Sequence, residues 1–121
     1  MRAIARRTGN TPGRMNKTEE RYSWQLEAKK QAGEVLWWAF EPVKLRLADK
    51  TFYSPDFLVV MADSTIEMHE VKQARAGQRT YYTDDSRVKI KVAAAAYPMF
   101  GFVGATLRAK RDGGHWEYEG F

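Results

Sequence analysis

The chain has 121 residues, no cysteine and a formal net charge of +5, and 44% of its residues are hydrophobic. This length suits one packed core but not two, and the composition is that of a folded domain. The absence of cysteine excludes a disulfide framework and a thiolate zinc site. No apolar run is long enough to span a bilayer, and the basic N-terminus lacks the apolar segment of a secretion signal, so a cytoplasmic protein is expected.

The excess positive charge lies at the N-terminus. Residues 1–17 contain no acidic residue, and the remainder of the chain is balanced in charge. This pattern predicts a flexible basic arm over residues 1–17, followed by a single domain over residues 18–121. The arm suits contact with a nucleic-acid backbone, although a solvated terminus and a transit peptide have the same composition. Its candidate DNA contacts are Arg6, Arg7, Arg14 and Lys17.

The first predicted element is a helix over residues 18–32, with Thr18 as its N-terminal cap. At 100° per residue, Glu19 falls on the same stripe as Tyr22 and Leu26, which is the better candidate for the buried face. Glu19 then points toward the sheet and could serve as an acid of a functional site. Compensation of the helix dipole is the alternative reason for an acid in a first helical turn.

Strands are expected next, because β-branched and aromatic residues alternate with turn-forming segments. The adjacent Trp37 and Trp38 could stack on exposed bases, but aromatic residues in a strand are more often part of the core. The predicted strands cover residues 34–40, 43–47, 51–61 and 66–72.

Charged residues interrupt the last two of these strands. Asp56 follows a proline at the start of an apolar run, where the backbone on both sides is extended. In the next strand, the two-residue period places Glu70 and Lys72 on one face and His69 on the other. If the two strands form a hairpin across residues 62–65, Asp56 comes close to Glu70 and Lys72.

This combination of side chains suits phosphodiester cleavage. Asp56 and Glu70 supply the hard oxygen ligands that Mg²⁺ takes in proteins. Lys72 could orient the attacking water or neutralise charge that develops on the phosphorus. The alternative is an ordinary turn pair and an ordinary charge pair on an exposed strand. His69 lies on the face opposite Glu70, and His115 lies in a terminal segment. A structural or surface role is therefore expected for both histidines.

A polar loop over residues 73–83 leaves the second charged strand, and its Arg75 and Arg79 are candidate phosphate contacts. A second helix is expected over residues 84–96, followed by a last core strand over residues 101–109. In this helix, a stripe of Val88, Val92 and Ala95 is predicted to pack on the sheet. Arg87 and Lys91 share another face and could line a groove for DNA.

The order of these motifs resembles the PD-(D/E)XK nuclease superfamily and, more narrowly, the phage endonuclease I-like family of junction-resolving enzymes. The resemblance runs from about residue 16 to residue 108. It is carried by Thr18-Glu19, by Tyr53-Ser54-Pro55-Asp56-Phe57, by Glu70-Val71-Lys72 and by Asp84-Asp85-Ser86-Arg87-Val88-Lys89.

The resemblance implies an α/β fold with a restriction-endonuclease-like core, in which a mixed sheet is flanked by two main helices. It implies that Asp56, Glu70 and Glu19 surround Mg²⁺, which Mn²⁺ can replace, and that Lys72 assists the attacking water. It further implies a homodimer that cuts branched DNA in the cytoplasm of a phage-infected or prophage-bearing bacterium.

Three points stay open at the level of sequence. A nuclease of the same fold could act on linear or single-stranded DNA, and a non-catalytic DNA-binding module could retain the fold. In endonuclease I the two protomers exchange segments through an extended bridge. Here the turn at residues 48–50 permits an ordinary hairpin, so Glu19 could serve its own site or that of its partner.

Overall fold

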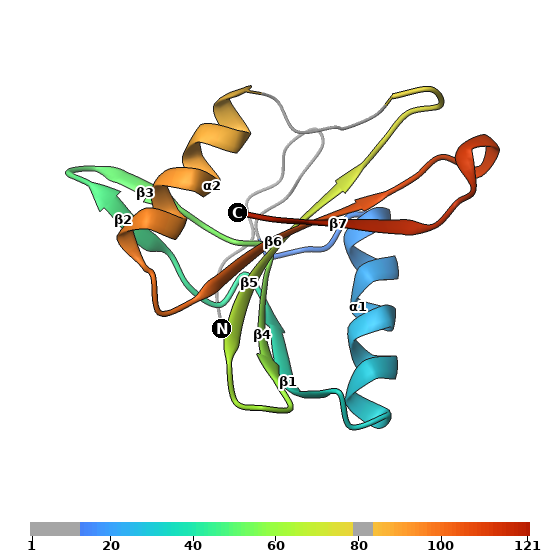
Figure 1. Cartoon of the computed structure of the whole chain (residues 1–121), viewed down its shortest axis with the longest axis horizontal. Coiled ribbons are helices and arrows are strands. Elements are labelled where there is room, and N and C mark those ends of the chain that lie inside the picture. The colour runs from blue at the N-terminus through green and yellow to red at the C-terminus, as the bar shows by residue number, and fades with distance from the viewer. Residues whose placement is uncertain (1–12, 79–83) are drawn as a thin grey trace.

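The computed structural model describes residues 13–78 and 84–121. Its centre is a five-stranded sheet in the order β1-β4-β5-β6-β7 (Figure 1). Only β5 and β6 run parallel, and the other neighbouring strands are antiparallel, so the sheet is mixed. The strands are β1 (Val35–Phe40), β4 (Phe57–Met61), β5 (Ile66–Gln73), β6 (Gly101–Leu107) and β7 (Trp116–Gly120).

Two helices and a small hairpin cover this sheet. Helix α1 (Lys17–Gln31) lies against one side, where it contacts β1 and β5. Helix α2 (Asp84–Ala96) lies on the other side with the hairpin of β2 (Leu45–Ala48) and β3 (Thr51–Tyr53), as Figure 1 shows. Because parallel strands need a crossover, α2 also carries the chain from β5 to β6. The predicted α/β class, with a mixed sheet between two main helices, is confirmed.

The cap of α1 differs from the prediction. The helix begins at Lys17, and Asn16 rather than Thr18 caps it. The Glu19 backbone N–H donates to the Asn16 side chain over 2.8 Å, and the Asn16 backbone N–H donates to the Glu19 carboxylate over 2.9 Å. This reciprocal pair is a capping box, and Asn caps a helix at least as well as Thr. The predicted inner stripe is confirmed, since Glu19, Tyr22 and Leu26 are all buried.

The core has two parts, one on each side of the sheet. The first lies between α1 and the sheet, where the Tyr22 and Phe57 rings meet at a centroid distance of 5.5 Å. The second lies under α2 and the hairpin. The first part contains Tyr22, Leu26, Val35, Phe57, Val59, Val71 and Ala105, and the second contains Leu45, Tyr53, Met68, Ile90, Ala93 and Phe102.

The predicted single strand over residues 51–61 is wrong, because two strands of different sheets occupy it. Tyr53 of β3 pairs with Leu45 of the hairpin, whereas Phe57 of β4 pairs with His69 of the main sheet. Pro55 lies between them, and a proline cannot donate the ladder hydrogen bond that a continuous central strand needs. Asp56 therefore stands where the chain crosses from the hairpin into the main sheet.

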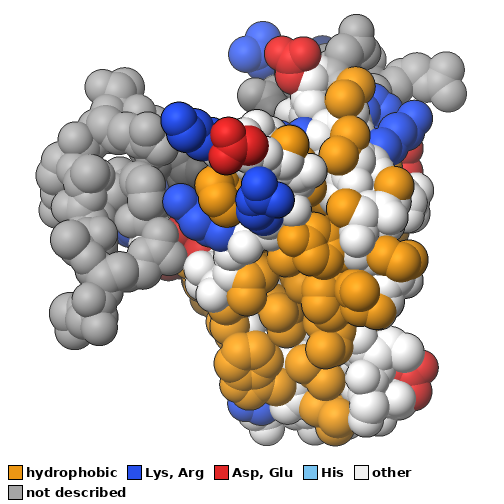
Figure 2. Space-filling view, turned by 90° about the vertical axis from the view of Figure 1, so that its left-hand side faces the viewer, with side chains coloured by type: hydrophobic (Ala, Val, Ile, Leu, Met, Phe, Trp, Pro, Cys, Tyr) orange, Lys and Arg blue, Asp and Glu red, His pale blue; other side chains and the backbone are white. Residues whose placement is uncertain are grey.

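The predicted inner face of α2 is also wrong. Val88 and Val92 are 59% and 44% exposed, and Ala95 is exposed as well, whereas Ile90 and Ala93 are buried. The helix is rich in small apolar residues on several sides, so its sequence does not define one buried stripe. Contacts with β2, β3 and β6 fix its rotation instead. Figure 2 shows how many hydrophobic side chains reach the surface on this side of the molecule.

The last core strand ends at Leu107 rather than at residue 109. A short 3-10 helix, Lys110–Asp112, follows it, and β7 then returns antiparallel to β6 as the edge of the sheet. Strand β7 was not among the predicted elements. Within the two described ranges, no helix is long and apolar enough to cross a bilayer.

Candidate active site

The crossing point between the hairpin and the main sheet fixes Asp56. Its Oδ2 accepts a hydrogen bond from the Val71 backbone N–H over 2.8 Å, and only 9% of the residue is exposed. Because Phe57 pairs with His69, Asp56 stands opposite Glu70, the next residue of β5. The predicted hairpin between the two charged strands is confirmed. Asp56 also lies next to Glu70, as that hairpin implies.

All four candidate catalytic residues line one cavity of about 350 Å³. Glu19 comes from the first turn of α1, Asp56 from the entry to β4, and Glu70 and Lys72 from β5. Glu19 of the same chain therefore completes this group of side chains. Among the described residues, the rest of the cavity wall is formed by Asn16, Thr18, Val71, Gln73 and Arg75.

The contacts of Glu70 include a hydroxyl group and an ammonium group. The Tyr53 hydroxyl donates to its Oε1 over 2.8 Å, and the Lys72 Nζ lies 3.4 Å from its Oε2. Tyr53 was not among the predicted site residues, although it precedes the Pro-Asp pair by two positions. Its contact depends on the path of β3, which the sequence did not reveal. Glu70 therefore has a fixed orientation at the cavity wall.

The electrostatics of the cavity favour a bound cation. Burial, followed by the charge of Glu70, raises the pKa of Asp56 to about 8, although the hydrogen bond from the Val71 N–H acts in the opposite direction. Burial also raises the pKa of Glu19, with contributions from the charges of Glu41 and Glu70, while hydrogen bonds from Asn16 and Asp56 act against the rise. Acidic groups are thus held close together at a free-energy cost that a cation can offset.

The donor chemistry fits Mg²⁺, which binds proteins through one or two carboxylates and keeps several waters. Asp56, Glu70 and Glu19 offer hard oxygen atoms at one cavity. In the described part of the chain, no three acidic or imidazole side chains already stand as a preformed metal cluster. The fit therefore rests on the identity and crowding of the donors and on the small number of protein ligands that Mg²⁺ needs.

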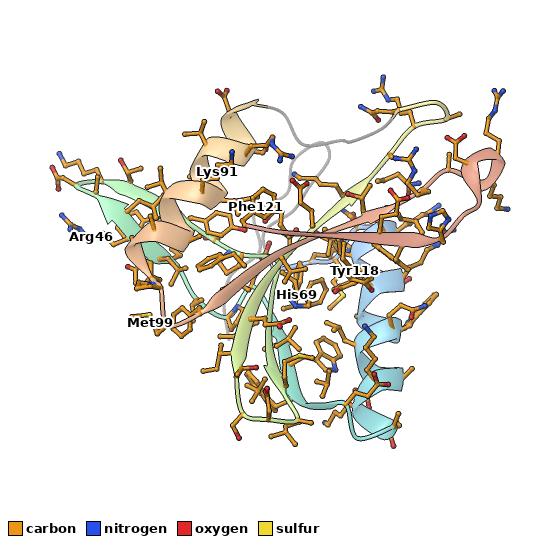
Figure 3. The ribbon with its side chains drawn as sticks, in the orientation of Figure 1. Arg46, His69, Lys91, Met99, Tyr118 and Phe121 are labelled. Carbon is orange, nitrogen blue, oxygen red and sulfur yellow. The ribbon has the colours of Figure 1, made fainter. Side chains whose placement is uncertain are left out.

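His69 has the structural role that the sequence suggested. It is buried on the α1 side of the sheet (Figure 3), where its Nε2 lies 2.8 Å from Glu67 Oε1 and its Nδ1 lies 2.6 Å from the Tyr22 hydroxyl. Because a carboxylate only accepts, the neutral ring carries its proton on Nε2 and accepts from Tyr22 at Nδ1. The hydrogen bond from His69 lowers the pKa of Glu67. This chain of contacts ties β5 to α1.

A further contact ties α1 to β5 beside the cavity. The Thr18 hydroxyl donates to Gln73 Oε1 over 3.0 Å. Thr18 thus acts between two elements rather than as the predicted helix cap.

The predicted DNA contacts fall into separate places. Arg75 lines the cavity, and Arg14 and Lys17 are exposed at the start of α1. Lys91 is exposed on α2 (Figure 3). Arg6, Arg7 and Arg79 lie outside the described residues.

Arg87 is engaged within the protein. Both of its terminal nitrogens donate to the Glu119 carboxylate, and its guanidinium lies 5.3 Å from the centre of the Phe121 ring. Lys89, which was not among the predicted contacts, instead lines a second cavity beside Glu70. The rotation of α2 described above accounts both for the contact of Arg87 with Glu119 and for the position of Lys89 at the second cavity.

No family model matches the chain, and no curated protein sequence matches it. Among solved structures, it is similar to Hjc of Archaeoglobus fulgidus, a Holliday junction resolvase from an archaeal hyperthermophile. The similarity covers 84% of this chain and 75% of that chain, at 15% sequence identity and a TM-score of 0.55. The two proteins share a restriction-endonuclease-like fold.

Proposed function

We propose that the protein is a Mg²⁺-dependent endonuclease that hydrolyses DNA phosphodiester bonds, and that branched DNA is its substrate. One observation supports the chemistry above all others. Glu19, Asp56, Glu70 and Lys72 come from three separate elements and line a single cavity. Three acids and an amine at one cavity suit metal-assisted phosphoryl transfer.

Each of these residues has a role in the proposed mechanism. Asp56 and Glu70 would hold Mg²⁺, and Glu19 would supply a third acid at the same cavity. When bound, Mg²⁺ polarises a phosphoryl oxygen and lowers the pKa of a coordinated water. Lys72, placed beside Glu70, orients the attacking water and balances the negative charge that develops on the phosphorus. Mn²⁺ is expected to substitute for Mg²⁺, because both favour oxygen ligands.

The choice of branched DNA is supported by the shared fold with Hjc, which is itself a Holliday junction resolvase. Resolution of a four-way junction needs two nicks, and a two-fold symmetric homodimer supplies two active sites. The sequence motifs support the narrower assignment to the phage endonuclease I-like family. That assignment in turn supports a location in the bacterial cytoplasm. Arg75, Lys91 and the basic residues at the N-terminus are the proposed phosphate contacts.

The test is cleavage of a labelled four-way junction beside a linear duplex of the same sequence, in Mg²⁺ or in EDTA. Wild type is compared with Lys72→Ala and with Lys30→Ala, in which an exposed lysine in the last turn of α1 is removed. Lys30 lies about 16 Å along the helix axis from Glu19, so its loss controls for charge alone.

Paired nicks confined to the junction, dependent on Mg²⁺ and lost only in Lys72→Ala, are the expected result. Equal cutting of both DNAs contradicts selectivity for branched DNA but still supports the proposed nuclease activity. Binding of DNA without cutting, in either Mg²⁺ or Mn²⁺, overturns the proposed activity and leaves a binding module.

A further inference from the structure

A second cavity of about 310 Å³ adjoins the first, and Glu70 lines both of them. The second cavity lies between the hairpin and the N-terminal half of α2. It presents two serine hydroxyl groups and one ammonium group, from Ser54, Ser86 and Lys89. Phe52, Tyr53 and Ile90 also line it.

The rotation of α2 explains why these groups face the cavity. Ser86, Lys89 and Ile90 are three and four residues apart, so they share one side of the helix. Ile90 is 2% exposed and anchors that side in the core, while Lys89 extends from it into solvent. Arg87 belongs to a different side, where Glu119 holds it. The helix therefore presents Lys89, rather than Arg87, beside Glu70.

The charge of Glu70 does not make the second cavity acidic. Its Oε1 accepts from Tyr53 and its Oε2 lies beside the Lys72 ammonium, so its negative charge is balanced at the wall. Lys89 adds a positive charge, and Glu70 is the one acidic residue among the described residues that line this cavity. A lysine and two hydroxyl groups suit a phosphate oxygen, for which Lys is a common binder as a point charge.

We propose that the second cavity binds the DNA phosphate next to the scissile one, through Lys89, Ser86 and Ser54. This inference rests on the proposed nuclease activity and defines how the strand lies on the site. The strand passes from Arg75 across the carboxylates of the first cavity to Lys89 in the second. Efficient cleavage then requires a phosphate on one particular side of the scissile bond.

The first test measures how the dissociation constant of junction DNA depends on salt, without any need for cleavage. Each phosphate contact contributes about 0.7 to 0.9 to the slope of log affinity against log salt. Lys89→Gln is expected to lower that slope by about one contact. The matched control Lys30→Gln, which removes an exposed lysine far along α1, leaves it unchanged. Equal slopes for wild type and Lys89→Gln overturn the inference.

The second test uses junctions in which a single uncharged methylphosphonate replaces the phosphate on one side or the other of the cut. At one of the two positions, the substitution is expected to slow wild-type and Lys30→Gln cleavage about tenfold. It slows Lys89→Gln less than twofold, because that contact is already missing. Equal slowing of Lys89→Gln and wild type, or no slowing of wild type at either position, contradicts the proposed phosphate site.

The two tests separate the proposals from each other. If wild type cuts no DNA but Lys89→Gln still lowers the salt slope, the nuclease proposal fails, and Lys89 is a DNA phosphate contact with no scissile phosphate beside it. If wild type cuts in Mg²⁺ while Lys89→Gln behaves as wild type in both assays, the phosphate site fails and the nuclease stands.

Discussion

The Val71 backbone N–H donates to Asp56 Oδ2 just beyond Phe57 and His69, the first pair of residues in which β4 meets β5. This bond holds the Asp56 carboxyl in a buried position beside Glu70, where both burial and charge disfavour ionisation. The same contact therefore places Asp56 at the cavity, in surroundings where a bound cation would favour ionisation of its carboxyl group.

The pH dependence of stability follows from Asp56. The folded protein keeps this proton up to about pH 8, whereas the unfolded chain loses it near the ordinary pKa of 3.8. The folded state thus binds more protons in that range, and the free energy of unfolding falls as pH rises from about 4 to 8. Each pKa unit corresponds to about 1.4 kcal/mol. The measurement is the melting temperature in EDTA between these pH values.

Asp56→Asn is the control for that measurement. The amide oxygen can still accept from Val71, but the side chain no longer titrates. The fall in melting temperature toward pH 8 is expected to be shallower in this variant, with a remainder from Glu19, whose pKa is also raised. A melting temperature of wild type that is constant or rises over this range contradicts the assignment.

Tyr53→Phe should weaken the metal site while the fold is retained. The variant keeps the aromatic ring, which lies 6.5 Å from that of Phe102, but loses the hydrogen bond to Glu70. Loss of a group that orients a metal ligand commonly costs tenfold or more in metal affinity or activity. Cleavage at low Mg²⁺ is expected to fall by about tenfold and to recover in part at high Mg²⁺.

The control for Tyr53→Phe is Tyr97→Phe, which removes a hydroxyl that donates to the Arg46 backbone oxygen over 2.8 Å. This bond lies outside the two cavities, so the Mg²⁺ dependence of Tyr97→Phe should equal that of wild type. If the two variants respond to Mg²⁺ in the same way, Tyr53 does not orient a metal ligand.

Tyr22→Phe should lower stability through His69. The buried Nδ1 of His69 loses the hydroxyl at 2.6 Å, and an unsatisfied buried acceptor costs about 1–3 kcal/mol. Thermal unfolding measures the loss as a lower melting temperature. Tyr118→Phe changes a tyrosine that is 49% exposed and should alter stability by less than about 0.5 kcal/mol. Equal melting temperatures for the two variants would show that the hydrogen bond to His69 contributes no stability.

Much of the site is predictable because its signals are local. The proline before Asp56 and the two-residue period of β5 place Asp56, Glu70 and Lys72 with little help from the rest of the fold. Glu19 shares a helical stripe with Tyr22, so its inward direction is also evident in the sequence.

The remaining features depend on contacts between distant segments. The division of residues 51–61 between two sheets, and with it the contact of Tyr53, requires knowledge of which strand each half joins. The rotation of α2 depends on its packing against the hairpin and β6, because small apolar residues occur on several of its sides. Lys89 could be found only after Ile90 was known to be its buried neighbour.

The most direct test of the proposed site is cleavage of a four-way junction in Mg²⁺ by Asp56→Asn, with Asp49→Asn as the matched control on an exposed turn. Asp56→Asn should lose at least about a thousandfold in cleavage rate while it binds the junction as wild type does, because a metal ligand is lost without change of shape. Asp49→Asn should cut at the wild-type rate. Full activity of Asp56→Asn would contradict the assignment of this cavity as the active site.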